Sequence, residues 1–209
     1  MNYTVKEVFY TLQGEGAQAG RAAVFCRFSG CNLWSGREAD RDRAICRFCD
    51  TDFVGTGPDG GKFADAGALA AHIRAGWRGQ GGTPYVVFTG GEPLLQLDAA
   101  LITALHRLGF EIGVETNGTL PAPDGIDWLC VSPKAGTDWV QRRGDEIKLV
   151  YPQPALLPDT VATDGFTHAW LQPMDGPART EHTRAAIAAC LTDPRWRLSV
   201  QTHKITGIR

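Results

Sequence analysis

Short apolar runs recur along this chain, separated by polar segments rich in glycine and proline. Residues 3–11 alternate between apolar and polar side chains, which predicts a strand with one buried face. Seven further apolar runs predict strands at 22–28, 85–88, 112–114, 128–131, 147–150, 169–171 and 198–200. Apolar residues at helical spacing predict helices at 65–77, 97–108 and 180–191.

The order of these elements predicts an α/β fold. Early strand–helix–strand units favour a parallel sheet, because parallel strands need long crossover connections. Later connections are too short for a helix, and a complete eight-fold barrel needs about 250 residues, whereas this chain has 209. We therefore predict an incomplete, abridged (β/α) partial barrel with some helices reduced to loops, built as a single domain over residues 1–209.

One segment interrupts this pattern. Residues 32–61 are polar, charged and rich in glycine, which predicts a long insertion. A loop of this length inside a compact domain is usually functional.

Polar groups also gather where the predicted strands end. The motifs that follow five of these strands are Thr89-Gly90-Gly91-Glu92-Pro93, Glu115-Thr116-Asn117-Gly118, Ser132-Pro133-Lys134, Gln172-Pro173-Met174-Asp175 and Gln201-Thr202-His203-Lys204. Parallel α/β folds build their sites at this edge. Turns are polar in any protein, which accounts for the glycines and prolines. It accounts less well for Glu115, Lys134, Asp175 and His203, so we predict a site there.

Three cysteines, one just before the insertion and two within it, have a spacing typical of metal ligands. Cys46 and Cys49 form a CxxC pair, and Cys31 lies upstream with fourteen residues between it and Cys46. Three thiolates suit a 4Fe–4S cluster whose fourth iron stays open. A zinc site remains an alternative, with His72 or a distant thiol as the fourth ligand. A disulfide is a second alternative.

The other cysteines, Cys26, Cys130 and Cys190, lie in apolar strand or helix patterns and are expected to pack as small apolar side chains. Unpaired thiols without an apolar signal stretch favour a reducing cytoplasm. The net charge of −2 favours neither nucleic acid nor an anionic membrane. No run approaches the roughly 18 apolar residues that a membrane span requires.

Arg27 stands in an apolar predicted strand, beside Cys26 and Phe28. A buried guanidinium needs an anionic partner, and its planar fork matches a carboxylate. That partner is either the carboxylate of a substrate or an acidic side chain of this chain.

Taken together, the cysteines and the Gly90-Gly91-Glu92-Pro93 strand end resemble the radical S-adenosylmethionine (SAM) superfamily. Within it the whole chain is similar to the 7-carboxy-7-deazaguanine synthase family. Its marks are the strand-end motifs above together with Leu12-Gln13-Gly14-Glu15-Gly16, Phe25-Cys26-Arg27-Phe28-Ser29-Gly30-Cys31-Asn32-Leu33 and Cys49-Asp50-Thr51. One feature departs from the superfamily, because most members place three residues between the first two cysteines. Some enzymes of the synthase family resemble this chain in carrying an inserted segment there.

The resemblance implies a set of ligand contacts. Cys31, Cys46 and Cys49 would hold the 4Fe–4S cluster, and Thr51 would hold Mg²⁺. The residues implied to contact SAM are Phe48, Cys49, Asp50, Gly91, Ser132, Pro133, Lys134, Gln172, Pro173, Met174 and Asp175. The residues implied to contact the substrate are Leu12, Gln13, Gly14, Arg27, Thr89, Glu115, His203 and Arg209, the last through its terminal carboxylate.

The implied reaction converts 6-carboxy-5,6,7,8-tetrahydropterin to 7-carboxy-7-deazaguanine with loss of ammonia. It is an Mg²⁺-dependent ring contraction in queuosine and 7-deazapurine biosynthesis, in which SAM is used catalytically. The resemblance further implies a homodimer that receives electrons from a donor such as flavodoxin or ferredoxin. Two other functions stay open at this point: an activase that installs a glycyl radical on a protein, and a zinc-bearing binding module.

Overall fold

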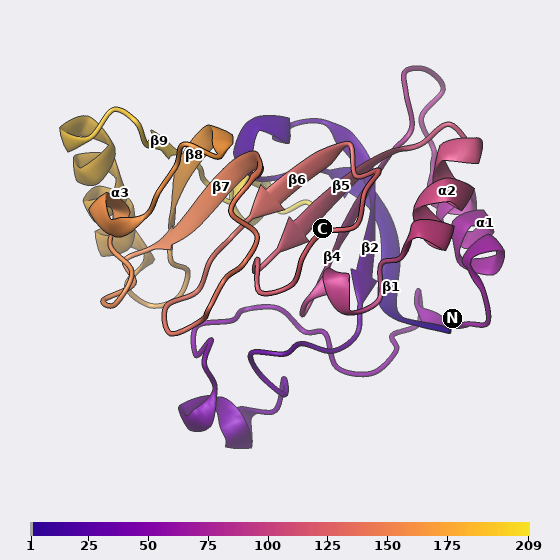
Figure 1. Ribbon diagram of the computed structural model, residues 1–209, viewed down its shortest axis with the longest axis horizontal. Coiled ribbons are helices and arrows are strands. Elements are labelled where there is room, and N and C mark those ends of the chain that lie inside the picture. The colour runs from indigo at the N-terminus through magenta and orange to yellow at the C-terminus, as the bar shows by residue number, and fades with distance from the viewer. Residues whose placement is uncertain (1) are drawn as a thin grey trace.

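The computed structural model describes residues 2–209, and their nine strands form one sheet (Figure 1). In sheet order the strands are β3 (Gly61–Phe63), β1 (Tyr3–Leu12), β2 (Ala22–Phe28), β4 (Tyr85–Gly90), β5 (Glu111–Thr116), β6 (Trp128–Val131), β7 (Gly144–Tyr151), β8 (Phe166–Pro173) and β9 (Arg197–Leu198). From β2 to β9 every neighbouring pair is parallel, whereas β1 runs antiparallel to both β2 and β3. The sheet does not close, which confirms the predicted partial barrel.

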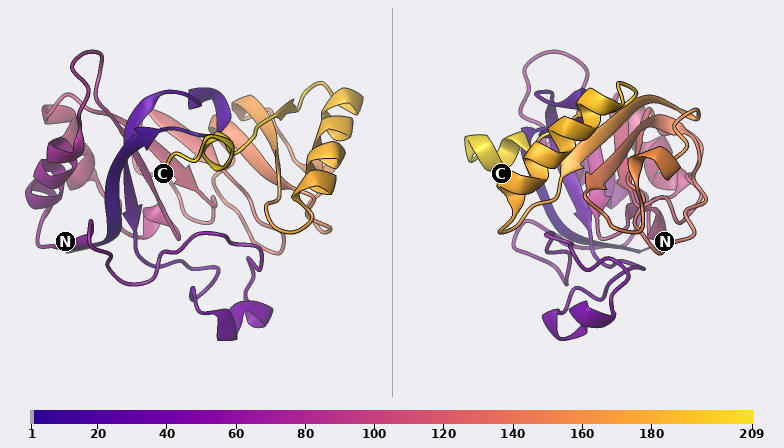
Figure 2. Two further views of the ribbon diagram at one scale, coloured as in Figure 1. Left: turned by 180° about the vertical axis from the view of Figure 1, so that it is seen from behind. Right: turned by 90° about the vertical axis from the view of Figure 1, so that its left-hand side faces the viewer.

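Helices cover the two ends of the sheet and leave its middle to loops. The helices are α1 (Ala66–Gly76), α2 (Ala99–Arg107), α3 (Arg179–Thr192) and α4 (Thr202–Thr206), with short 3-10 turns η1 (Gly16–Gln18), η2 (Glu38–Arg43), η3 (Pro93–Leu95) and η4 (Pro158–Thr160). No helix connects β5 to β6 or β6 to β7 in the described chain. Figure 2 shows α1 and α2 at one end and α3 at the other. The expected reduction of helices to loops is thus confirmed.

The first two helices begin where aspartate side chains cap them. Asp65 Oδ1 accepts a hydrogen bond from the amide of Ala68 at 2.8 Å, and Asp98 Oδ1 accepts one from Leu101 at 2.9 Å. Both caps satisfy amides that the first helical turn leaves without a partner. Asp98 also accepts from the hydroxyl of Tyr3 at 2.7 Å, which ties α2 to β1.

Alternation within the strands divides the sheet into an apolar face and a polar face. Val114, Ile147 and Leu149 belong to the main hydrophobic core. Their neighbours along the strands, Glu115 and Lys148, point to the opposite face, because side chains alternate in a strand. The polar face is therefore the inner wall of the partial barrel.

Two segments differ from the sequence-based expectation. The predicted insertion does not stay a loop to its end, because β3 pairs antiparallel with β1 in the register Tyr3 with Phe63. Three residues are too short to show an alternating pattern, so only the pairing reveals this strand. The strand predicted at 198–200 is observed only at Arg197–Leu198, as β9, and the chain after it, where no helix is predicted, forms α4. The chain leaves the sheet at Ser199 and is held by a hydrogen bond from the amide of Thr202 to the carbonyl of Gly14, at 3.0 Å.

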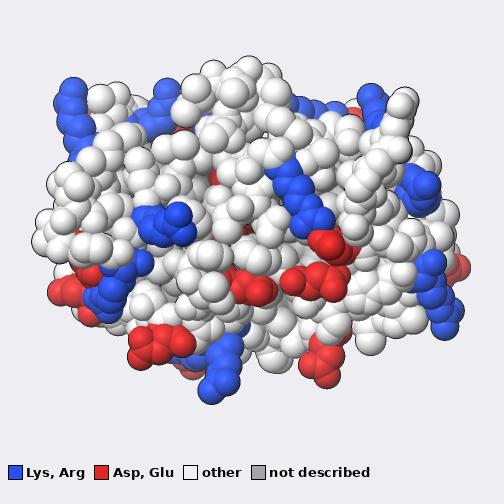
Figure 3. Space-filling view, turned by 90° about the horizontal axis from the view of Figure 1, so that it is seen from above, with Lys and Arg blue, Asp and Glu red and all other residues white. Residues whose placement is uncertain are grey.

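Within residues 2–209, every helix is too short or too polar to cross a membrane. Figure 3 views the molecule from the side opposite the insertion, and lysines and arginines there are interspersed with acidic residues.

Candidate active site

A cavity of about 450 Å³ opens at the carboxyl ends of the parallel strands, between the sheet and the insertion. It is lined by all of the site residues expected from the sequence except Pro133. Pro133 is buried beside the cavity, and its carbonyl accepts a hydrogen bond from Gln153 Nε2 at 3.5 Å. Pro133 therefore lies just outside the cavity lining, and the SAM contact expected at this proline stays a prediction.

Cys31, Cys46 and Cys49 line this cavity together. The amide of Leu33 donates to Cys31 Sγ at 3.4 Å. Burial raises the pKa of the Cys31 thiol, and it raises the pKa of Cys46 to about 11 although Lys134 opposes the shift. Buried thiolates need a cation to compensate their charge, and this donor set fits a bound iron–sulfur cluster.

The insertion is closed at its base by one carbonyl group. Leu33 O accepts hydrogen bonds from the amides of Ile45 at 3.1 Å and Cys46 at 3.5 Å. The chain therefore starts a loop after Leu33 and ends it beside the same residue. We call this loop, residues 34–44, the excursion. Without the excursion, three residues would separate Cys31 from Cys46, namely Asn32, Leu33 and Ile45. This is the spacing typical of the radical SAM superfamily.

The excursion has packing of its own, centred on Arg41. The Arg41 guanidinium lies over the ring of Trp34 at 4.1 Å and pairs with Glu38 at 2.5 Å. It also donates to the carbonyl groups of Arg47 at 2.7 Å and Cys49 at 3.1 Å. Arg41 thus fixes the backbone of the CxxC turn from outside the cavity.

The double glycine after β4 touches the cluster loop. A Cβ atom at Gly91 would overlap the Gly30 carbonyl and the Cys31 side chain. Glycine is needed here because the backbone approaches so closely. The buried Glu92 then joins two strand ends: its carboxylate accepts from the Thr116 hydroxyl at 2.7 Å and the Asn117 amide at 2.8 Å.

A lysine between two glutamates forms the inner wall of the cavity. Lys148 Nζ lies 2.5 Å from Glu15 Oε2 and 2.7 Å from Glu115 Oε2. Burial alone would raise the pKa of Glu15, but Lys148 and neighbouring amides lower it to about 2. Burial and the nearby charges of Glu15 and Glu146 raise the pKa of Glu115. The two carboxylates that share one ammonium group thus differ in pKa, which is lowered for Glu15 and raised for Glu115.

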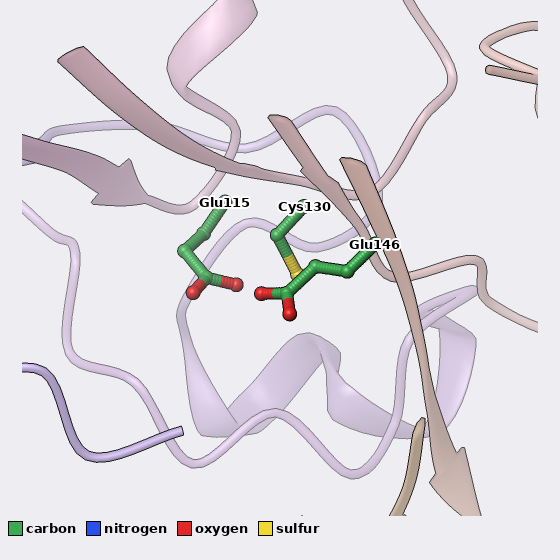
Figure 4. A group of neighbouring side chains, drawn as sticks. All are labelled: Glu115, Cys130 and Glu146. Carbon is green, nitrogen blue, oxygen red and sulfur yellow. The ribbon is translucent and has the colours of Figure 1, made fainter. Parts of the chain in front are cut away.

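Glu115, Cys130 and Glu146 come from three neighbouring strands and point toward one another (Figure 4). Their ligand atoms lie within 4.8 Å, which is close enough for a metal ion. However, Glu146 Oε2 already accepts from the indole of Trp170 and the amide of Ala17, each at 2.8 Å. Because Lys148 also holds Glu115, we read this group as part of the wall.

Within residues 2–209, Glu115, Cys130 and Glu146 form the single group of three or more His, Cys, Asp or Glu residues whose ligand atoms all lie within 4.8 Å of one another. The sulfur atoms of Cys31, Cys46 and Cys49 therefore lie farther apart than this. That wider spacing suits one thiolate per iron. The ligands of a single zinc ion, with bonds near 2.3 Å, would lie closer together. His72, the expected fourth zinc ligand, lies exposed on α1, where its ring packs 5.0 Å from that of Phe63. Neither His72 nor the distant thiols of Cys26, Cys130 and Cys190 line the cavity, so the zinc alternative finds no fourth ligand there.

Arg27 has an acidic partner within the chain. Its Nε donates to Glu7 Oε1 at 2.8 Å, and Arg209 pairs with the other oxygen of Glu7 at 2.7 Å. The internal ion pair considered from the sequence is therefore present. Among the described residues the two terminal nitrogens of Arg27 have no partner, and this pair of atoms can bind the two oxygens of a carboxylate end-on.

The SAM-side residues are held in place by short contacts. Lys134 Nζ donates to the carbonyl of Ser132 at 2.6 Å and to its hydroxyl at 2.7 Å, and burial lowers the pKa of Lys134. Gln172 Oε1 accepts from the Ser199 hydroxyl at 3.1 Å. Asp175 pairs with Lys204 at 2.6 Å.

Several lining residues received no role from the sequence, chiefly Glu7, Glu15, Lys148 and Lys204. Lys148 could have been found, because a lysine inside the apolar run 147–150 is the same signal that singled out Arg27. Glu15 and Lys204 stood within motifs without an assigned contact. Glu7 carries no such signal, since its partner is far away in sequence.

Comparisons with known proteins agree with this geometry. Residues 42–141 match the model of the radical SAM superfamily. The chain is 65% identical to a 7-carboxy-7-deazaguanine synthase of Bradyrhizobium diazoefficiens and 64% identical to one of Bordetella pertussis, with full coverage of both proteins in each case. The crystal structure of QueE from Escherichia coli matches with a TM-score of 0.70 at 29% identity, covering 96% of this chain and 94% of that one.

Membership of the superfamily brings a 4Fe–4S cluster and SAM, and the thiols and strand ends described above fit both groups. Full-length identity above 60% leaves no room for a different family. The chain belongs to the 7-carboxy-7-deazaguanine synthase family of radical SAM enzymes.

Proposed function

We propose that this protein converts 6-carboxy-5,6,7,8-tetrahydropterin to 7-carboxy-7-deazaguanine and ammonia, as a carbon–nitrogen lyase of queuosine and 7-deazapurine biosynthesis. One observation carries the proposal: the cluster cysteines, the SAM-type strand ends and a separate acidic and basic wall meet in one cavity. The names of the full-length relatives support the same reaction.

On the cofactor side, Cys31, Cys46 and Cys49 would each bind one iron. Bound cluster and SAM together supply the radical chemistry that starts the ring contraction. The chain's own part is to orient SAM: Lys134 would neutralise its carboxylate, and Asp175 would accept from a ribose hydroxyl. The other proposed SAM contacts are Phe48, Cys49, Asp50, Gly91, Ser132, Pro133, Gln172, Pro173 and Met174.

On the substrate side, the wall offers both signs of charge. Gln13 Nε2 donates to Glu115 Oε1 at 3.1 Å, and both side chains would contact the amide and amino edge of the pterin. The terminal nitrogens of Arg27 would bind the 6-carboxylate. The other proposed substrate contacts are Leu12, Gly14, Thr89, His203 and the carboxylate of Arg209.

The proposed magnesium ligand is the hydroxyl of Thr51, which lines the cavity next to Asp50. A hydroxyl is a hard oxygen donor, and Mg²⁺ commonly keeps one or two protein oxygens alongside substrate and water.

The remaining proposals concern the whole molecule. We propose a single domain over residues 1–209 with the insertion at about 32–61, because one sheet and one main core include both ends of the chain. We propose a homodimer, reduced by a donor such as flavodoxin or ferredoxin. Six free thiols support a reducing cytoplasm as the place of action.

The test is an anaerobic assay with reconstituted protein, SAM, reductant, Mg²⁺ and 6-carboxytetrahydropterin, read by mass spectrometry. We expect 7-carboxy-7-deazaguanine and no requirement for a protein substrate, which would distinguish the enzyme from a glycyl-radical activase. Absence of product from protein with a full cluster contradicts the proposal. Arg27→Ala should weaken substrate binding, whereas Arg43→Ala, an exposed arginine of the excursion, serves as the control.

A further inference from the structure

The open side of the partial barrel is bridged by the short helix α4. The strands at the two edges of the sheet are β3 and β9, so no strand pairing joins the first strands to the last. Thr202 instead bonds to the carbonyl of Gly14 through its amide at 3.0 Å and its hydroxyl at 2.8 Å. Figure 2 shows this helix, in yellow, lying against the indigo strands near the chain end.

Lys204, on this helix, connects it to two further segments at the rim. Its Nζ lies 2.5 Å from Asp50 Oδ2, next to the cluster ligand Cys49, and 2.6 Å from Asp175 Oδ2, just after β8. One ammonium group thus joins the cluster loop, the end of β8 and α4. The cluster loop precedes the other two segments by more than a hundred residues in the sequence.

We propose that Lys204 is a positioning residue that fastens α4 across the open side of the barrel and holds the cluster loop at the end of β8, so that SAM and the pterin share one closed cavity. This inference rests on the proposed function, because it takes Asp50 and Asp175 as SAM-side residues and His203, next to Lys204, as a pterin-side residue.

The contacts explain why one side chain matters so much here. A helix of five residues does not hold its shape alone, since helix formation in water needs about 12–15 residues. Within α4, the side chains that bond to other segments are those of Thr202 and Lys204. Beyond the helix, Arg209 ties the chain end to Glu7 and Asp59. Loss of Lys204 would leave the far end of α4 without an anchor on the cluster side.

The contacts of Lys204 show that its ammonium group is held by two carboxylates and is not freely solvated. The Lys204 side chain is 24% exposed, and both of its carboxylate partners accept at hydrogen-bonding distance. Burial lowers the pKa of Lys204, but Asp175 and Asp50 outweigh this and raise it. The nearest other cation, Arg179, is 3.9 Å from Asp175 and does not reach the cluster loop as a replacement.

The proposal is tested by substituting Lys204 in the reconstituted holoenzyme. Lys204→Met removes the clasp, Lys204→Arg keeps its charge, and Lys62→Met on β3 is the matched control at an exposed lysine. Two quantities are measured under anaerobic conditions: the dissociation constant of SAM by equilibrium dialysis, and amide hydrogen exchange of residues 49–52 and 201–207.

We expect Lys204→Met to weaken SAM binding about tenfold, the scale of a lost charged hydrogen bond. Exchange in both segments should accelerate by a similar factor, because local opening becomes easier. Lys204→Arg should recover most of both effects, and Lys62→Met should change neither. Asp50→Asn removes one of the two carboxylate partners of Lys204 without changing the sequence of α4. If Lys204→Met does not fold, Asp50→Asn should still show the faster exchange of 201–207.

Three results separate the possibilities. Wild-type SAM affinity in Lys204→Met overturns the clasp, whether or not exchange changes. Unchanged exchange at 201–207 overturns it as well. Failure of the wild-type holoenzyme to bind SAM instead refutes the proposed function, on which the clasp depends.

Discussion

The excursion at 34–44 and the inner wall around Lys148 both place a cation beside the site, but in opposite surroundings. Arg41 of the excursion keeps 28% of its side chain exposed and pairs with a mostly exposed glutamate. Lys148 keeps 5% exposed and holds two largely buried carboxylates. The loop thus positions the cysteine ligands through backbone hydrogen bonds. The wall positions its charged side chains through strand register and buried ion pairs.

The strongest way to break this comparison is to remove a cluster ligand. Cys49→Ala should abolish activity and lower iron bound per chain, because one iron of the cluster loses its thiolate. Iron analysis and the electron paramagnetic resonance spectrum of the reduced protein check this. Cys190→Ala on α3 is the matched control and should bind iron normally. Full iron content and activity in Cys49→Ala would assign the cluster to other cysteines.

The next largest effect is expected in the wall. Lys148→Met leaves Glu15 and Glu115 buried without their shared cation, and breaking a buried ion pair costs about 3–5 kcal/mol. Urea unfolding of the variant gives this number. Arg41→Met should cost far less, about 1 kcal/mol or below, because exposed pairs contribute little. Equal losses in the two variants would show that the two regions do not differ as described.

A pH series sharpens the same contrast. The pKa of Glu15 is lowered to about 2 from its usual 4.5, so its ionised form stabilises the fold above about pH 4.5. This stabilisation is lost as the pH falls from about 4.5 toward 2. Its size is about 3 kcal/mol at one pKa unit per 1.4 kcal/mol. Glu15→Gln should flatten this part of the curve of unfolding free energy against pH, and an unchanged slope would argue against the assignment.

The smallest effect is expected from deletion of residues 34–44. The Leu33 carbonyl already holds the amides of Ile45 and Cys46, so most of the iron binding should persist although the bonds from Arg41 to the carbonyls of Arg47 and Cys49 are lost. Unfolding free energy should fall by about 1–2 kcal/mol, because Phe53 loses the ring of Trp34, 5.6 Å away. Deletion of 34–45 leaves two residues between the cysteines and should lose iron. Equal iron content in both deletions would show that spacing at the base does not matter.

The sequence predicted the sheet well because most of its strands are short, mainly apolar and separated by clear turns. It also predicted the cavity, since carboxyl ends of parallel strands share one edge whatever the sheet order. It missed β3, because pairing with β1 creates that strand. It missed the contact between Arg27 and Glu7 because the antiparallel register of β1 on β2 decides it.

The inner wall shows the other limit of sequence reasoning. Lys148 and Glu115 could be suspected from charges within apolar strands, but Glu15 reaches them from a loop at the far end of the barrel. Its position depends on Glu146, which accepts the Ala17 amide, and on Ser199, whose hydroxyl accepts the Gly16 amide at 3.0 Å. Contacts across more than a hundred residues leave no local pattern to read.

The Leu33 carbonyl has a consequence for recognising such enzymes from genomes. A search that counts residues between cysteines along the chain sees fourteen here and three elsewhere, and it sorts one architecture into two groups. If the count skips any loop whose ends share a hydrogen bond, both groups give the same number. The same point offers engineers a graft site, where a reporter peptide could replace the excursion provided that it keeps the bonds of Arg41 to the CxxC turn.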